Sequence, residues 1–365
     1  MSAPRSSPTP APSSYKDVPT LSVSVRGVDF VYRQLGPEGD GVPLIMLHHL
    51  TAVLDDWDPR VIDGLAARRR VITFDNRGVG ASGGSTPDTI EAMARDAVLF
   101  IRALGFEQVD LLGLSLGGFI AQVIAAEEPQ LVRRVILAGT GPAGGPGIDK
   151  VTALTLRDIL KGFLTRKDAK QFLFFTDTEH GRREARAFLE RLKERTDHRD
   201  KAISLRSFRA QLKAIHRWGL QPSADLSRIR QPVLVANGES DRMVPSENTL
   251  DLAARLPRGK LVPLYPDAGH GGIFQFHEAF AARALAFLEA RPDAWPLMPH
   301  PPPSRPGRGR ASRAALDQTP SCPPAVPAAP PRTPSTPHAG STSPPGRTLP
   351  VSTRRDGNGS AQLYG

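Results

Sequence analysis

The chain has 365 residues, a net charge of +10 and a single cysteine, Cys322. This length suffices for one large domain with appended segments, and one cysteine excludes a disulfide within the chain. No apolar run approaches the length of a membrane span, and the N-terminus lacks the apolar stretch of a signal peptide. We therefore expect a cytoplasmic protein with no membrane partner.

Both ends of the chain have a biased composition. Residues 1–19 are rich in Ser, Pro and Ala, and the segment from Trp295 onward holds 17 of the 36 prolines. Such segments bury too little apolar surface to offset the entropy lost on ordering. The composition predicts a disordered N-terminal segment over 1–19 and a disordered Pro/Arg-rich tail over 293–365.

The positive charge is concentrated outside the expected core. The segment from 295 onward contributes +6, and residues 150–217 hold 18 Lys or Arg against 9 Asp or Glu. Within 150–217 both signs alternate at helical spacing, which is typical of solvated helix faces. The arginines of the tail are not interleaved with aromatic residues, so no nucleic-acid partner is expected.

Short apolar runs alternate with helical patterns along the chain. Residues 21–25 and 28–33 indicate an edge hairpin, and the apolar runs expected as further strands are 44–47, 71–74, 109–112, 134–138, 231–236 and 260–265. Helices are expected to follow Thr86-Pro87-Asp88, over 118–126 and from about 273 to 290. This alternation predicts an α/β fold with a mostly parallel, doubly wound sheet.

The stretch between residues 138 and 232 is too long for a single crossover between strands. Its pattern over 149–217 is helical, which indicates an inserted helical cap. We predict an α/β core over 20–140 and 226–292 and a cap over 141–225. Apolar cap residues such as Phe163, Phe172 and Trp218 are expected either in the core or along a pocket.

Gly113-Leu114-Ser115-Leu116-Gly117 lies between an expected strand and an expected helix. A serine at such a turn is held in a strained backbone conformation with its hydroxyl exposed. Glycines two residues before and after it prevent collisions with the neighbouring elements. Ser115 is therefore the predicted nucleophile.

A serine hydroxyl needs a base, and the base needs an orienting acid. His270 follows the last expected strand in a glycine-rich loop and is the predicted base. Asp241, in the loop after 231–236, is the predicted acid, with Glu239 in the same loop as the second candidate. The order Ser115, Asp241, His270 is the one found with this type of serine turn.

A tetrahedral intermediate also needs donors for its oxyanion. The backbone N–H of Leu116 at the helix start and that of Leu50, in the loop after 44–47, are the predicted donors. Neighbouring His48 and His49 seldom present both rings to one ion, and no carboxylate or thiolate cluster accompanies them. No metal and no other cofactor is expected.

With these motifs the chain closely resembles the α/β-hydrolase fold superfamily over about residues 20–290. The motifs that carry the resemblance are His48-His49-Leu50-Thr51, Phe74 to Ser82, the Ser115 turn, Asp241 to Pro245 and Gly269-His270-Gly271. The resemblance implies an ester-type hydrolase without a cofactor, and loop-shaping roles for Asp75 and Arg77. Arg77 is also considered as a substrate contact, as is His49, which stands where family members usually carry glycine.

The predicted function is hydrolysis of a small carboxylic ester or related acyl substrate through an acyl-enzyme. That acyl substrate is the only partner expected, and no oligomeric state is inferred. The alternatives are a non-catalytic small-molecule-binding protein of the same fold, a C–C hydrolase and a perhydrolase. Ser115 excludes the aspartate chemistry of related dehalogenases, and Gly271 stands where C–C hydrolases often carry tryptophan.

Overall fold

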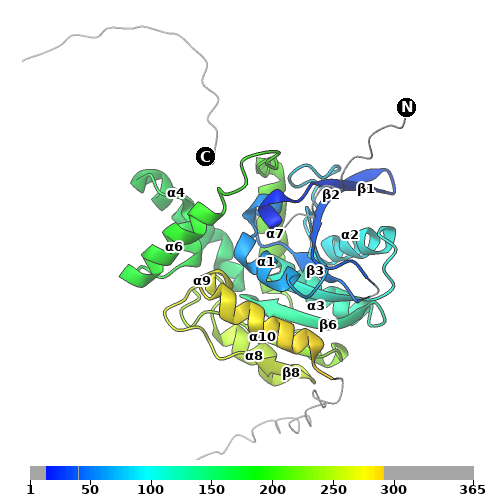
Figure 1. Cartoon of the computed structure of the whole chain (residues 1–365). Coiled ribbons are helices and arrows are strands. Elements are labelled where there is room, and N and C mark those ends of the chain that lie inside the picture. The colour runs from blue at the N-terminus through cyan, green and yellow to red at the C-terminus, as the bar shows by residue number, and fades with distance from the viewer. Residues whose placement is uncertain (1–13, 40, 292–365) are drawn as a thin grey trace, which may run out of the picture. The chain divides into compact units, whose positions relative to one another are not determined.

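A single eight-stranded sheet forms the centre of the computed structural model, which describes residues 14–39 and 41–291 (Figure 1). The strand order is β1-β2-β4-β3-β5-β6-β7-β8; β2 pairs with β1 and β4 in antiparallel register, and all other pairs are parallel. The strands are β1 (Leu21–Val25), β2 (Val28–Leu35), β3 (Leu44–Leu47), β4 (Val71–Phe74), β5 (Val109–Leu114), β6 (Val132–Ala138), β7 (Val233–Ala236) and β8 (Gly259–Leu261). The predicted hairpin and the mostly parallel sheet are confirmed.

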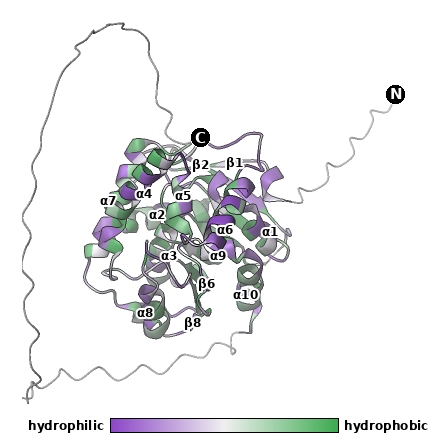
Figure 2. Cartoon of the chain, turned by 90° about the vertical axis from the view of Figure 1, so that its left-hand side faces the viewer, coloured by the Kyte–Doolittle hydropathy of each residue, from purple (hydrophilic) through white to green (hydrophobic). Residues whose placement is uncertain are grey.

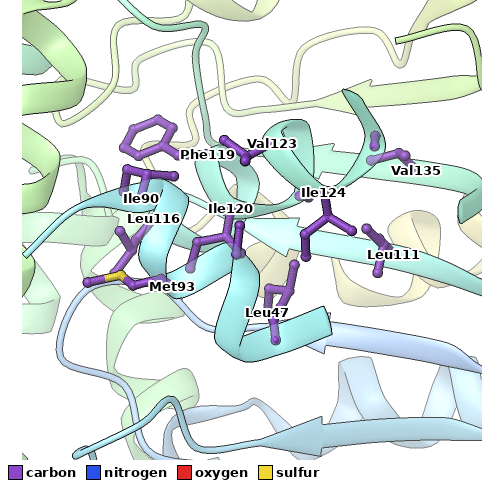
Figure 3. Packing of buried hydrophobic residues seen from close by; sticks show 14 of the residues in the cluster. Leu47, Ile90, Met93, Leu111, Leu116, Phe119, Ile120, Val123, Ile124 and Val135 are labelled. Atoms are coloured by element: carbon purple, nitrogen blue, oxygen red, sulfur yellow. The ribbon is translucent and has the colours of Figure 1, made fainter. Parts of the chain in front are cut away.

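Helices cover both faces of the sheet. Side chains of alternate strand residues point to opposite faces and pack into two separate hydrophobic clusters. In β3, Ile45 and Leu47 join the cluster under α2 and α3, whereas Leu44 and Met46 join the one under α1 and α10. The core helices are α1 (Pro59–Ala66), α2 (Ile90–Ala103), α3 (Leu116–Glu127), α8 (Glu247–Arg255), α9 (Gly272–Gln275) and α10 (His277–Glu289). Figure 3 shows side chains of α3 packed between those of α2 and the sheet.

Four further α-helices lie between β6 and β7, where the sequence predicts a cap. They are α4 (Val151–Thr165), α5 (Ala169–Phe174), α6 (Glu179–Arg191) and α7 (Leu205–Leu220). Asp168, Thr178 and Ser204 accept hydrogen bonds from the first turns of α5, α6 and α7, which explains where these helices begin. In Figure 1, α4 and α6 lie to the left of the sheet. The proposed domain boundaries at 140 and 225 remain predictions.

Four single-turn 3₁₀ helices complete the described elements: η1 (Tyr15–Asp17), η2 (Leu54–Asp56), η3 (Ile148–Lys150) and η4 (Leu226–Arg228). Within the described residues, no helix is long and apolar enough to cross a bilayer. The predicted tail over 293–365 lies outside the described residues.

Several element ends differ from the sequence-based expectations. Helix α2 begins at Ile90, not after Thr86, because the hydroxyl of Thr89 accepts a hydrogen bond from the N–H of Ala92 at 3.3 Å. The last strand is only three residues long, and the last helix is interrupted at Phe276. Thr86 and Thr89 are chemically equivalent as helix caps, so the residue type does not show at which threonine the helix begins. The packing of the apolar stripe of the helix in the fold decides it.

Residues 14–19 are ordered, so the prediction of disorder over 1–19 was wrong for this part. Tyr15 is buried, and its hydroxyl lies 2.9 Å from the carbonyl of Leu54 and 2.8 Å from the Thr73 hydroxyl. The backbone N–H of Tyr15 also donates to Asp63 at 2.7 Å. One aromatic anchor with satisfied polar groups orders a segment whose average composition indicates disorder. Residues 1–13 lie outside the described part.

Candidate active site

Ser115 occupies the sharp turn between β5 and α3 in a backbone conformation that L-residues rarely adopt. Its φ is 55° and its ψ is −116°. The N–H of Ser115 donates to the carbonyl of Ala138 at 2.9 Å, and its carbonyl accepts from the Thr140 hydroxyl at 2.8 Å. The end of β6 and the residues after it therefore hold this strained turn in place.

The two glycines that flank Ser115 sit where no side chain would fit. A Cβ added to Gly113 would lie 2.3 Å from the carbonyl oxygen of Gly117, and a Cβ on Gly117 would lie 2.1 Å from that of Leu47. Both distances are far below van der Waals contact. The close approach at Gly117 also places the start of α3 directly against the end of β3 and the loop that follows it.

His270 and Asp241, which lie 29 positions apart in the chain, form a buried pair. The Nδ1 atom of His270 lies 2.8 Å from Oδ2 of Asp241. The other carboxylate oxygen accepts the N–H groups of Met243 at 2.8 Å and Val244 at 3.1 Å, which fixes the acid. An Nδ1–H that donates to the carboxylate leaves Nε2 as a proton acceptor. Exposed Glu239, in the same loop, is not the carboxylate that contacts His270.

Gly139 connects the serine turn to the histidine. It directly follows Ala138, which holds the N–H of Ser115, and a Cβ on Gly139 would lie 3.3 Å from Nδ1 of His270. Its φ of 51° also favours glycine. The segment after β6 thus brings the Ser115 turn and the His270 ring to one edge of the sheet. Sequence reasoning missed Gly139, although a glycine at the carboxyl end of a buried strand could have drawn attention to it.

The loop that contains Leu50 is held by the cap. Thr51, at a φ of 69°, donates its N–H to the side-chain oxygen of Gln211 in α7 at 2.8 Å, and Gln211 is fully buried. Leu116 is the first residue of α3, where backbone N–H groups have no partner within the helix. Sequence reasoning missed Gln211, because no local pattern relates two residues 160 positions apart.

His48 and His49 are both buried and electrically neutral near neutral pH. Burial lowers the pKa of His48 to about 3 and that of His49 to about 4. The Nδ1 atom of His49 lies 2.8 Å from the carbonyl of Leu50, and its ring meets that of Phe174 edge-on at 5.0 Å. Among the described residues, no group of three or more His, Cys, Asp or Glu side chains could hold a metal ion.

Asp75 and Arg77 make contacts that shape the loop after β4. Asp75 accepts the N–H of Leu54 at 3.0 Å, and burial together with the neighbouring Asp200 raises the pKa of its carboxyl well above the usual range. The guanidinium of Arg77 lies 3.5 Å from the carboxylate of Asp96 in α2. A substrate contact for Arg77 or His49 remains a prediction.

A cavity of about 450 Å³ reaches His270. Its lining includes Phe172, Phe175 and Gly269, together with the cationic side chains of Arg157, Lys161 and Arg242. Arg242 donates to the carboxylate of Asp158 in α4 and to the carbonyl of Phe172. The cap therefore forms one wall of the cavity and is tied to the loop that carries Asp241.

A strained serine between a strand and a helix, at the same carboxyl edge of a parallel sheet as a buried His–Asp pair, is typical of hydrolases with a nucleophilic serine. The family model described as alpha/beta hydrolase fold matches residues 42–276. The chain belongs to this alpha/beta hydrolase family, as the sequence motifs predicted.

Known relatives are similar over most of their length. A protein of Caulobacter sp. (strain K31) with the provisional name carbamate hydrolase RutD is 30% identical over 271 residues, which covers 72% of this chain and 96% of the relative. The human serine hydrolase BPHL is 26% identical, and the match covers 77% of this chain and 90% of the human protein. An alpha/beta hydrolase fold protein from Chitinophaga pinensis, of known structure, is 40% identical. The match covers 76% of this chain and 99% of the Chitinophaga protein, and the two structures superpose with a TM-score of 0.72. Family and relatives together support hydrolytic activity.

Proposed function

We propose that this protein is a serine hydrolase that cleaves a small carboxylic ester or a related acyl substrate through an acyl-enzyme intermediate. In this proposal Ser115 is the nucleophile, His270 is the general base and Asp241 orients the imidazole. The N–H groups of Leu116 and Leu50 stabilise the oxyanion. The observation that carries the proposal is the 2.8 Å contact between His270 and Asp241 at the same edge of the sheet as a serine held at a φ of 55°.

The proposed reaction begins with attack of the Ser115 hydroxyl oxygen on the acyl carbon, while Nε2 of His270 takes the hydroxyl proton. The negative charge that develops on the carbonyl oxygen is stabilised by the two N–H donors, each worth about 3–4 kcal/mol in the transition state. His270 then protonates the departing alcohol. Water repeats the sequence on the acyl-enzyme, with His270 again acting as base, and releases the acid.

The size and lining of the cavity at His270 favour a small substrate. Its volume of about 450 Å³ lies within the range of small-molecule sites, and aromatic side chains of the cap form part of its wall. The name of the Caulobacter relative points to carbamates, in which a nitrogen is attached to the acyl carbon. The same attack and the same oxyanion would serve esters and carbamates alike.

The proposal is tested by the Ser115→Ala variant on p-nitrophenyl acetate and p-nitrophenyl butyrate. We expect kcat to fall by about 10³-fold or more, because removal of the nucleophile leaves only binding and oxyanion stabilisation. Ser24→Ala, an exposed serine on β1, is the matched control and should retain full activity. A fluorophosphonate probe should label the wild type and the control but not Ser115→Ala.

Turnover that survives in Ser115→Ala would overturn the nucleophile assignment. Absence of turnover in the wild type on esters, thioesters and carbamates, with no probe labelling, would favour the non-catalytic binding protein instead. The two results are distinct, because the probe reports on the serine independently of the substrate.

Perhydrolysis is a second candidate, supported by a relative in Streptomyces lividans named non-heme chloroperoxidase that is 27% identical and covers 72% of this chain. In this reaction hydrogen peroxide replaces water in the second step, so the acyl-enzyme yields a peroxyacid. Peroxyacetic acid formed from p-nitrophenyl acetate and hydrogen peroxide by the wild type, but not by Ser115→Ala, would establish it.

A further inference from the structure

Helix α4 of the cap has an inverted pattern of burial. Its buried residues include Thr155, Asp158 and Gly162, which are polar or small. Its exposed residues include four large apolar side chains, with exposed fractions of 52% for Leu156, 57% for Leu160, 80% for Phe163 and 72% for Leu164. These four residues, which we call the α4 apolar face, recur at helical spacing and form one continuous stripe. The expectation that Phe163 lies in the core or along the pocket was wrong.

Two basic side chains, Arg157 and Lys161, lie beside the α4 apolar face, and two more, Arg166 and Lys167, follow directly after the helix ends at Thr165. Within the described part of the chain no ion pair neutralises these exposed side chains, which are Arg157, Lys161, Arg166 and Lys167. At 100° per residue, Arg157 and Lys161 lie between the apolar face and buried Asp158. Figure 2, which views the cap from the front, shows hydrophilic and hydrophobic residues side by side along α4.

The same border adjoins the mouth of the cavity at His270. Arg157, Asp158 and Lys161 all line this cavity, and Asp158 pairs with Arg242 on its wall. Around the helix, the order is therefore apolar face, cationic border and cavity. A surface that covered the apolar face would lie next to the residues of α4 that line this cavity.

We propose that α4 docks on an anionic lipid surface, with the α4 apolar face in the acyl boundary and the four cations at the headgroups. Large apolar side chains beside Lys and Arg on a helix are typical of interfacial membrane helices. A second copy of the chain fits less well, because an antiparallel two-fold pairing of α4 would bring Arg157 and Lys161 of both copies to the same edge. The expectation of no membrane partner considered only spanning segments, and this inference revises it.

The inference goes beyond the proposed function and is tested without any measurement of turnover. The full-length protein is sedimented with vesicles of phosphatidylcholine, either pure or mixed with phosphatidylglycerol, at low and high salt. We expect binding to the mixed vesicles that weakens with salt. The double variant Leu160→Ser/Phe163→Ser should lower the partition coefficient by about tenfold or more, since each side chain loses its apolar transfer.

Two further variants separate the contributions. Arg166→Gln/Lys167→Gln should weaken binding to the mixed vesicles and reduce its salt dependence, because two of the four cations are removed. Leu250→Ser, which alters a leucine on α8 with 46% exposure, is the matched control and should bind as the wild type does. Melting temperatures should be unchanged in all variants, because none of these side chains is buried.

Three results would overturn the inference. One is equal sedimentation with and without vesicles of either composition. A second is undiminished binding by Leu160→Ser/Phe163→Ser, which would place the contact elsewhere in the chain. The third is a vesicle-independent dimer in light scattering that this double variant converts to a monomer, since a second copy would then cover the face.

Discussion

His48 and His49 show how burial sets the charge of single residues beside the site. Both rings are neutral near neutral pH because burial lowers their pKa values to about 3 and about 4. A neutral His49 ring fits against Phe174, whereas a charged ring there would lack hydration. A fall in pH is therefore expected to lower the stability of the fold, because these two buried rings resist protonation.

The free energy of unfolding should depend on His49 over a defined pH range. The folded pKa of about 4 lies below the ordinary value of 6.5, so between these values the unfolded chain binds one more proton at this residue. Stability from this term is present above pH 6.5 and is lost as the pH falls towards 4. In urea titrations, His49→Asn should reduce the slope of unfolding free energy against pH by about 1.4 kcal/mol per pH unit. Identical slopes would show that His49 is charged in the folded protein.

The residues that a motif defines could be predicted from the sequence. Ser115 is marked by its glycines, and Asp241 and His270 by their positions after strands; the structure pairs the last two at 2.8 Å. Gly139 and Gln211 could not be found in this way. Their contacts join segments that are distant in the chain, and neither contact leaves a periodic or local pattern.

At the scale of elements, the turn between β5 and α3 depends on very close backbone approach. Gly117 allows the carbonyl of Leu47 to come within 2.1 Å of the position that a Cβ would take. The same contact sets the distance between the start of α3 and the loop proposed to bind the oxyanion. The stability of the fold and the proposed rate of catalysis are therefore both expected to depend on the absence of a side chain at Gly117.

Gly117→Ala should lower the unfolding free energy by about 2 kcal/mol and kcat by about 100-fold, because α3 must move away from β3. Gly41→Ala is the matched control, since a Cβ on Gly41 meets nothing within 4 Å. Thermal unfolding and p-nitrophenyl acetate hydrolysis measure the two effects. A wild-type unfolding free energy and kcat for Gly117→Ala would contradict this prediction, because α3 could then move away from β3 without any effect on the site.

Strand and helix types followed from the sequence, whereas their ends often did not. The strands of the parallel sheet are continuous apolar runs because both faces are covered. The start of α2 at Ile90 and the short β8 depend on packing that no local composition encodes. The burial of α4 is the largest difference, because its polar face points inward to Arg242 and its apolar face points outward.

At the scale of the described molecule, ion pairs join the cap to the core. The guanidinium of Arg191 in α6 contacts both carboxylate oxygens of Asp58, at 3.0 Å and 2.7 Å, and donates to the carbonyl of Phe274 at 3.2 Å. Asp58 is fully buried and also caps α1 through the N–H of Arg60. These contacts fix α6 against the start of α1 and against α9.

Arg191→Met should lower the unfolding free energy by about 3–5 kcal/mol, because it leaves the buried Asp58 carboxylate without its partner. Chemical denaturation measures the change. The double variant Arg191→Met/Asp58→Asn should be less destabilised than the sum of the two single variants, since no unpaired charge remains. Additive effects would show that the two side chains do not interact energetically.

The hydrogen bond from Thr51 to Gln211 gives the cap a second role besides lining the cavity at His270. Helix α7, which carries Gln211, thereby holds the loop from which one of the oxyanion donors is proposed to come. A cap transplanted from a homologue would replace the cavity wall that α4 and α5 form and, without a glutamine at the position of Gln211, would also release the loop that holds Thr51.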